Sequence, residues 1–126
     1  MPLVRISLRR GRPAQYRRAL RDGVYEAMRE SFEVPPGDRF MLVTEHDDGD
    51  FDYSADYLGI GRSDDLVIIQ LTVSNTRTLE QKKALYRRIV ERVSENPGIR
   101  PQDVFISLVE VNRENWSFGN GEAQYA

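Results

Sequence analysis

The sequence has no cysteine and only one histidine, His46, among its 126 residues. Without cysteine there is no disulfide framework, no thiolate nucleophile and no cysteine-ligated metal site, and one histidine excludes histidine clusters. No apolar run approaches the roughly 20 residues of a membrane helix, and the start lacks the apolar stretch of a signal peptide. We therefore expect a cytoplasmic protein with no membrane segment, folded as one domain over residues 1–126.

Charge is nearly balanced overall but unevenly distributed along the chain. The formal net charge is −2, yet residues 1–21 hold seven arginines and no acid, whereas residues 45–65 hold eight acids and one arginine. A basic segment can bind nucleic acid. Several of these arginines, however, fall at positions that an amphipathic helix turns toward water. The pattern favours a solvated helix face over a nucleic-acid surface.

The chain is an internal repeat with a period of 65 residues, which pairs residues 4–43 with residues 69–108. Apolar positions match throughout, as in Val4/Ile69 and Val24/Ile89, so duplication explains the pattern better than chance. Identical pairs include Arg12/Arg77, Ala19/Ala84, Leu20/Leu85, Pro36/Pro101, Asp38/Asp103 and Phe40/Phe105.

Each repeat unit, about residues 2–45 and 66–111, is predicted to be strand, helix, strand. Alternation and apolar runs predict strands at 3–8, 40–44, 66–73 and 104–111. Pro13 is typical of a helix start, and Thr78 to Gln81 has the capping-box pattern. The expected apolar stripes are Leu20, Val24, Ala27 and Met28 on the first helix, and Leu85, Tyr86, Ile89, Val90 and Val93 on the second.

Two right-handed units joined edge to edge about a pseudo-twofold axis predict an α+β fold, with a mixed four-stranded sheet and both helices on one face. The first unit's strands then start beside the end of the third strand. Pro2, Asp38 and the loop 74–77 should therefore meet at one edge of the sheet.

Pro2 is the residue with the most specific chemistry at this edge. A small second residue normally permits removal of Met1, which would leave a free secondary amine at the start of a strand. Such an amine titrates near neutrality, so it can act as acid, base or nucleophile. The alternative is that a proline in second position has no role.

Three other features have both a functional and a structural interpretation. Arg77 precedes a helix N-terminus, where an arginine is electrostatically misplaced unless it binds an anion or is held by an acid such as Glu80. Asp38 follows Pro-Pro-Gly and is either a turn residue or a carboxylate that acts on the amine. The aromatic residues of 116–121 wall a pocket, anchor the tail against another subunit, or pack in the core.

Taken together, several segments resemble the tautomerase superfamily, and within it the malonate semialdehyde decarboxylase group. The five segments are Met1-Pro2, Gly37-Asp38-Arg39, Gly61-Arg62-Ser63, Arg77-Thr78-Leu79-Glu80-Gln81-Lys82 and Asn115-Trp116-Ser117-Phe118-Gly119. The resemblance spans nearly the whole chain, and the last two segments are its most specific part.

The resemblance implies a homotrimer, a catalytic amino-terminal proline and no metal or organic cofactor. By position, Pro2 is the catalytic proline, Asp38 the active-site aspartate and Arg77 the arginine that binds the substrate carboxylate. Trp116 and Phe118 contribute an apolar wall. Asn75 is expected to bind substrate together with these two residues, and it is also a departure, because some members of the group carry a second arginine there, so less positive charge surrounds the proline.

Three functions follow as hypotheses. The first is decarboxylation of a small 3-oxo acid, with hydration as a side reaction, in which Pro2 is an ammonium acid or forms an iminium. The second is keto–enol tautomerisation of a 2-oxo acid, with Pro2 as a neutral base. The third is a non-enzymatic module that binds anions or nucleic acid, and the absence of a concentrated basic-aromatic surface ranks it last.

Overall fold

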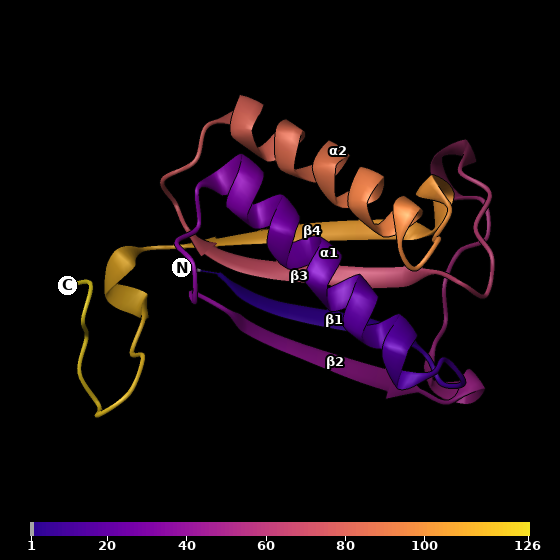
Figure 1. Cartoon of the computed structure of the whole chain (residues 1–126), viewed down its shortest axis with the longest axis horizontal. Coiled ribbons are helices and arrows are strands. Elements are labelled where there is room, and N and C mark those ends of the chain that lie inside the picture. The colour runs from indigo at the N-terminus through magenta and orange to yellow at the C-terminus, as the bar shows by residue number, and fades with distance from the viewer. Residues whose placement is uncertain (1) are drawn as a thin grey trace.

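The computed structural model describes residues 2–126, in which one four-stranded sheet carries two long helices (Figure 1). The strands are β1 (Leu3–Arg9), β2 (Phe40–His46), β3 (Val67–Ser74) and β4 (Val104–Val111), and the helices are α1 (Ala14–Phe32) and α2 (Leu79–Glu95). The fold class predicted from the repeat is confirmed.

The sheet has the strand order β2-β1-β3-β4 and the pseudo-twofold symmetry expected of the repeat. β1 pairs with β2 and β3 with β4 in parallel, whereas the central β1–β3 pair is antiparallel. Adding 65 to both members of the Leu3–Phe40 pair gives Ile68–Phe105, which is also paired. Leu3 lies opposite Thr72, so β1 begins beside the end of β3, as predicted.

Local signals explain where the helices begin and end. Thr78 Oγ1 accepts from the Gln81 amide at 3.2 Å, and Gln81 Oε1 accepts from the Thr78 amide at 2.9 Å, which completes the predicted capping box of α2. α1 ends at Phe32 because Glu33 adopts a left-handed conformation (φ 54°) and two prolines follow.

The core lies between the helices and one face of the sheet. The α1 stripe is fully buried, as are Leu85, Ile89 and Val93 of α2, whereas Tyr86 and Val90 are only half-buried and line an open surface depression. The helices approach closely at Gly23, where a Cβ atom would lie 3.2 Å from Val93 Cγ1. A small residue at this position therefore sets the spacing of the two helices.

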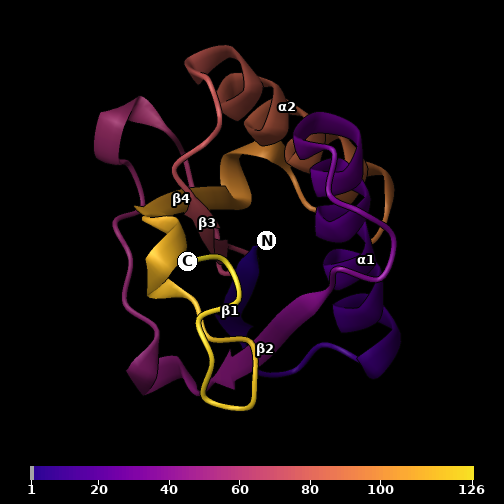
Figure 2. The ribbon, with the colours of Figure 1, turned by 90° about the vertical axis from the view of Figure 1, so that its left-hand side faces the viewer.

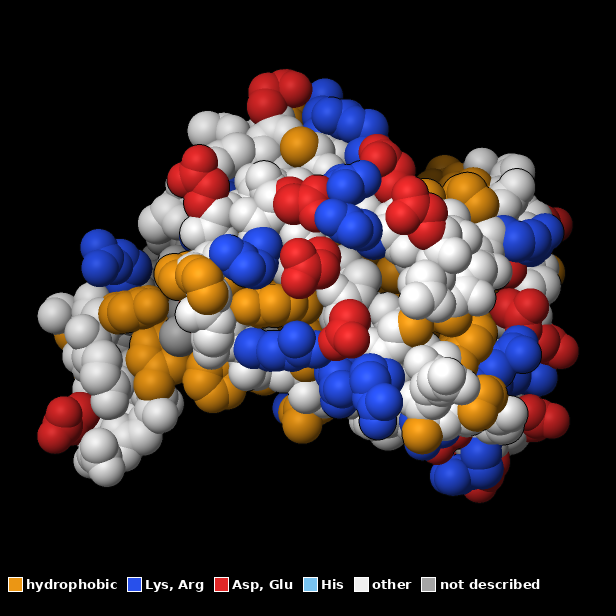
Figure 3. Space-filling model, viewed as in Figure 1, with side chains coloured by type: hydrophobic (Ala, Val, Ile, Leu, Met, Phe, Trp, Pro, Cys, Tyr) orange, Lys and Arg blue, Asp and Glu red, His pale blue; other side chains and the backbone are white. Residues whose placement is uncertain are grey.

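The other face of the sheet is not covered by helices (Figure 1). Alternation along the strands turns apolar side chains toward this open face, where Phe40 and Leu42 are each 50% exposed and Phe105 is 46% exposed. The helical face instead carries interspersed acidic and basic side chains (Figure 3). An exposed apolar sheet face marks an interaction surface.

The segment between β2 and β3 neutralises the basic start of the chain. It contains two short 3-10 turns, Asp48–Asp50 and Tyr57–Gly59. Its acids, together with Glu45, form ion pairs with four of the seven arginines in residues 1–21. These pairs are Arg9 with Asp48 and Asp64, Arg10 with Asp47, Arg12 with Asp65, and Arg17 with Glu45. The two opposite charge excesses of the sequence thus meet in the folded chain.

Neither helix in residues 2–126 combines the length and the apolar character needed to span a membrane.

Candidate active site

Pro2 is buried at the start of β1, where it lines a cavity of about 210 Å³. The C-terminal segment lies beside this end of the sheet (Figures 1 and 2). Its aromatic residues complete a predominantly apolar lining that consists of Pro2, Leu3, Phe40, Trp116, Ser117 and Phe118. The cavity is smaller than the roughly 300–1,000 Å³ typical of drug-sized ligands, so it suits a small molecule.

Asp38 lies next to this cavity, in the turn before β2. Its amide donates to the Pro35 carbonyl at 3.2 Å, so part of its role is the turn chemistry expected after Pro-Pro-Gly. The parallel register that pairs Leu3 with Phe40 brings Asp38 close to Pro2. Partial burial raises the pKa of the Asp38 carboxyl, and the positive charges of the amino terminus and Arg77 act in the opposite direction. The Asp38 carboxyl is thus within electrostatic reach of both the amino terminus and Arg77.

Arg77 is held by the end of α1 rather than by its own helix. Nη2 donates to the Phe32 carbonyl at 2.9 Å, Nη1 donates to Thr76 Oγ1 at 2.9 Å, and the guanidinium carbon lies 4.9 Å from the centre of the Phe32 ring. Because Phe32 is the last residue of α1, the cation sits at the negative end of that helix dipole. Glu80 is not among the contacts of Arg77 in residues 2–126. Sequence reasoning missed the α1 contact.

Asn75 is tied to the end of β4. Its amide donates to the Val111 carbonyl at 3.0 Å, and its side-chain nitrogen donates to Asn112 Oδ1 at 3.1 Å. The residue that replaces a second arginine is therefore exposed and engaged by a neighbouring loop, and it is not among the residues that line the Pro2 cavity.

The aromatic wall is anchored to β3. Trp116 Nε1 donates to Ser74 Oγ at 3.1 Å, and Ser74 is one of the two buried polar residues in the described chain. The Trp116 and Phe118 rings stack at 5.3 Å, and Tyr125 packs edge-on against Phe118 at 4.8 Å. The pocket-wall interpretation of 116–121 is therefore the one that the structure supports. Tyr125 was not predicted, although an aromatic residue near the C-terminus was the available signal.

The opposite end of the sheet contains the repeat equivalents of the residues at the Pro2 edge. Asp103, the repeat partner of Asp38, is fully buried and accepts from the Ser63 amide at 2.7 Å, Ser63 Oγ at 2.6 Å and Arg100 Nε at 3.0 Å. Burial raises the pKa of Asp103, but the hydrogen bonds from Arg100 and Ser63 outweigh it and hold the pKa below its usual value. The position equivalent to Pro2 is Val67, inside the chain, so this end has no free amine.

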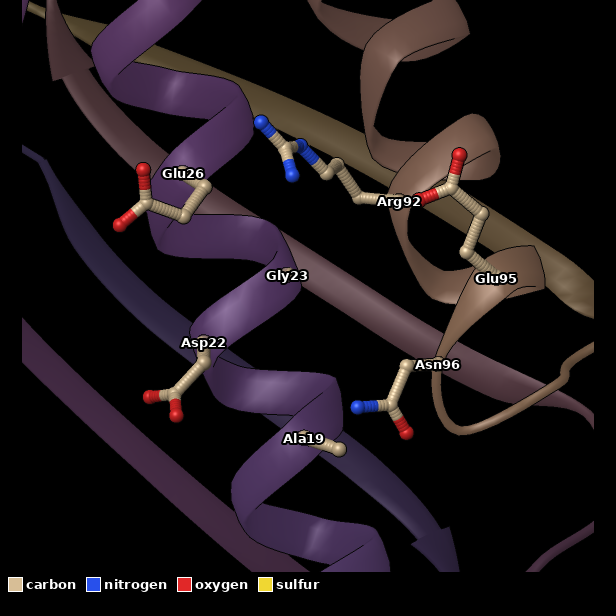
Figure 4. A pocket seen from close by; sticks show the side chains of 7 residues that line it. All are labelled: Ala19, Asp22, Gly23, Glu26, Arg92, Glu95 and Asn96. Atoms are coloured by element: carbon tan, nitrogen blue, oxygen red, sulfur yellow. The ribbon is translucent and has the colours of Figure 1, made fainter.

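A second depression lies between α1 and α2 (Figure 4). It is lined by Asp22, Glu26 and Glu95 together with Arg92 and small or amide side chains, and none of its residues belongs to the Pro2 edge. Within residues 2–126, no group of three or more histidine, cysteine or acidic side chains is arranged to hold a metal ion.

Comparison with known proteins identifies the family. A family model described as "Tautomerase enzyme" matches residues 38–119, and a second with the same description matches residues 2–59. The probable tautomerase YusQ of Bacillus subtilis (strain 168) is 42% identical over 124 residues, which cover 98% of each chain. The chain belongs to the tautomerase family. The probable tautomerase YrdN of the same organism is 37% identical over 125 residues, 99% of this chain and 96% of the relative.

Solved structures place this tautomerase-family enzyme close to malonate semialdehyde decarboxylases. One such decarboxylase, described with decarboxylase and hydratase activities, is 34% identical, with a TM-score of 0.90 over 98% of this chain and 95% of its own. The FG41 malonate semialdehyde decarboxylase inhibited by 3-bromopropiolate is 38% identical, with a TM-score of 0.91 over 98% of this chain and 93% of its own. A fused 4-OT symmetric trimer, 19% identical with a TM-score of 0.79, shares the fold over 95% of this chain and 94% of its own.

Proposed function

We propose that this enzyme decarboxylates a small 3-oxo acid of the malonate semialdehyde type, and that Pro2, freed by removal of Met1, is its catalytic group. The observation that carries the proposal is the position of Pro2, which is buried in a small apolar cavity with Asp38 and Arg77 at the same sheet edge. The similarity to two malonate semialdehyde decarboxylases supports it.

In this mechanism Arg77 binds the substrate carboxylate. A guanidinium has five N–H donors, and the contacts to Phe32 and Thr76 use only two of them. The remaining donors can hold a carboxylate so that the scissile carbon–carbon bond stands perpendicular to the plane of the 3-carbonyl group. The bond is then aligned with the π system of the 3-carbonyl group, which accepts the electrons as carbon dioxide leaves.

Pro2 supplies the acid in this mechanism. As an ammonium it hydrogen-bonds to the 3-carbonyl oxygen and stabilises the enolate that forms when carbon dioxide departs. Protonation of the enolate at C2 then completes the aldehyde product. The Asp38 carboxylate favours the protonated amine, whereas the positive charge of Arg77 opposes it, and Asn75 adds no second positive charge. Asp38 can also orient a water molecule, which would allow hydration as a side reaction.

The alternative keeps the same cavity and makes Pro2 a neutral base that tautomerises a 2-oxo acid. The family name and the probable tautomerases of B. subtilis favour this reaction. The apolar lining also favours a neutral amine, because desolvation lowers the pKa of a cation. A ¹⁵N titration of Pro2 separates the two mechanisms, since an amine that is neutral well below pH 7 is incompatible with the acid.

The binding-module hypothesis loses its main support. Four of the seven arginines in residues 1–21 form ion pairs with Glu45 and the acids that follow it, so little unpaired positive charge is left for a phosphate backbone. Phosphate contacts require free lysine or arginine side chains. Salt-sensitive RNA binding that survives Pro2→Ala would restore this hypothesis.

We further propose a homotrimer assembled through the open sheet face. Phe40, Leu42 and Phe105 form an exposed apolar surface there, and the fused 4-OT neighbour is a symmetric trimer. Phe40 also lines the Pro2 cavity, so assembly would complete the wall of the site. Sedimentation equilibrium should give three times the 14.6 kDa chain mass, and Leu42→Asp should lower it.

The deciding experiment compares wild type and Pro2→Ala on a panel of 2-oxo and 3-oxo acids. Intact mass must first show that Met1 is absent, because an acylated Pro2 nitrogen cannot act. We expect turnover of 3-oxopropanoate to fall by about a hundredfold or more in Pro2→Ala, the usual contribution of a general acid. Pro101→Ala, at the opposite end of the sheet, should retain wild-type rates. Equal rates in wild type and Pro2→Ala would refute the proline mechanism.

A chemical probe tests the same nitrogen independently. The FG41 decarboxylase is inhibited by 3-bromopropiolate, an electrophilic alkynoate. If Pro2 has the same reactivity, incubation should add mass to the N-terminal peptide of wild type. Modification at any other residue would count against the assignment.

A further inference from the structure

The chain turns back on itself after the aromatic wall. Gly119, Asn120 and Gly121 all have positive φ angles, 143°, 60° and 68°, which residues of these types adopt most easily. The turn returns residues 122–126 to the wall, where hydrophobic side chains gather between the C-terminal loop and the body of the protein (Figure 3). Residues 122–126 thus fold back against the aromatic wall, although none of them is among the residues that line the Pro2 cavity.

Gln124 closes this loop with both ends of its side-chain amide. Oε1 accepts from the Phe118 amide at 2.9 Å, and Nε2 donates to the Gly119 carbonyl at 2.9 Å. The amide therefore pairs with the backbone as a neighbouring strand would. Gln124 itself is exposed and is not part of the cavity lining, so any effect on the site must pass through Phe118.

The neighbour of Gln124 adds a third layer to the aromatic wall. Tyr125 meets Phe118 edge-on at 4.8 Å, and the guanidinium of Arg113 lies 5.6 Å from the centre of the Tyr125 ring. Trp116 is fixed to β3 by its hydrogen bond to Ser74, whereas the amide of Phe118 donates its hydrogen bond to Gln124. The two hydrogen bonds of Gln124 with Phe118 and Gly119 are called the C-terminal clip below. The position of Phe118 in the wall therefore depends on this clip.

We propose that Gln124 is a positioning residue that holds the Trp116, Phe118 and Tyr125 stack against the Pro2 cavity. The proposal rests on the proposed function only in treating that cavity as the place where substrate binds. Gln124 forms no contact with Pro2, Asp38 or Arg77 among the described interactions. Loosening the clip should therefore weaken substrate binding and leave the chemical step and its pH dependence unchanged.

Gln124→Met tests the clip, because methionine has a similar length but offers neither strong hydrogen bond. Each lost hydrogen bond corresponds to about a two- to tenfold change in the population of the closed loop. We expect the KM for 3-oxopropanoate to rise about three- to tenfold, with kcat within about twofold and an unchanged pH profile. Gln124→Glu keeps the acceptor for the Phe118 amide but loses the donor to Gly119. Its KM should therefore lie between those of wild type and Gln124→Met.

A second readout does not depend on catalysis. Trp116 is the only tryptophan, so intrinsic fluorescence reports on the wall alone. In Gln124→Met the emission should move to longer wavelength and acrylamide quenching should increase, because water gains access to the loosened stack. Gln102→Met replaces an exposed glutamine at the far end of the sheet and should match wild type in both readouts.

The outcomes are distinct. Fluorescence and KM that match wild type in Gln124→Met would overturn the positioning role, as would a fall in kcat with KM unchanged. If Pro2→Ala were fully active, the proposed function would fail, and the fluorescence of Gln124→Met would still decide whether the clip holds the wall. Far-UV circular dichroism must show wild-type folding in each variant.

Discussion

Asp38→Asn and Asp103→Asn form a matched pair of substitutions, because the repeat places the two aspartates at equivalent positions while their surroundings differ. Asp103 accepts three hydrogen bonds in full burial. Hydrogen bonds to a charged group contribute about 1.5–3 kcal/mol each, and an asparagine would turn its NH₂ group toward one of these donors. We expect Asp103→Asn to lower the free energy of unfolding by about 2–4 kcal/mol at pH 7.

The pH dependence of stability should distinguish the two residues by sign. The folded-state pKa of Asp103 is lowered, so its stabilisation is present above the unfolded value near 3.9 and is lost as pH falls through the folded pKa. The pKa of Asp38 is raised, so its contribution is present below the unfolded value and is lost as pH rises through the folded pKa. Asp38→Asn should therefore be as stable as wild type at pH 7, or slightly more stable.

Chemical denaturation from pH 3 to pH 8 at one fixed protein concentration measures these differences, since assembly would make stability depend on concentration. The gap between wild type and Asp103→Asn should shrink below about pH 4. Activity should show the reverse pattern, with about a hundredfold loss in Asp38→Asn and little change in folded Asp103→Asn. Equal destabilisation by the two substitutions, or an active Asp38→Asn, would refute the assignment of one aspartate to chemistry and the other to structure.

Two further substitutions test local features. Thr78→Ala removes the side chain that accepts from Gln81 and should lower the free energy of unfolding by about 1 kcal/mol in denaturant titrations; an unchanged midpoint would mean that the capping box contributes nothing. Ser74→Ala leaves the Trp116 indole N–H without its acceptor, so the KM for 3-oxopropanoate should rise about two- to tenfold with a red shift in fluorescence; wild-type values for both would show that this anchor is dispensable.

The periodic features of the sequence were sufficient to predict the fold. The 65-residue repeat and its apolar pattern predicted the four strands, the two helices and the strand pairing, all of which the structure confirms. The stripe of α2 was predicted too broadly, because Tyr86 and Val90 are only half-buried and line an open surface depression. Hydrophobic spacing identifies a helix, but it does not define how wide a face its neighbours bury.

The sequence also predicted which residues share an edge, because Pro2, Asp38 and Arg77 lie at the ends of paired strands. It did not reveal what holds them. The contact of Arg77 with Phe32 joins residues 45 positions apart, and that of Trp116 with Ser74 joins residues 42 positions apart. Neither contact follows a period, so no pattern in the chain indicates it. The clip formed by Gln124 is local, but it depends on a turn whose direction the sequence does not specify.

What the sequence by itself determined is the duplicated strand, helix, strand architecture and the edge where the amino terminus meets Asp38 and Arg77, because apolar periodicity and chain direction are encoded locally and are repeated. What only the tertiary structure decided is which side chains surround each copy of the duplicated edge. Ser63 and Asp65 fill the surroundings of Asp103 and Arg12, whereas the aromatic C-terminus leaves a cavity beside Pro2. Long-range side-chain contacts determine these two different surroundings, and such contacts exist only once the chain has folded.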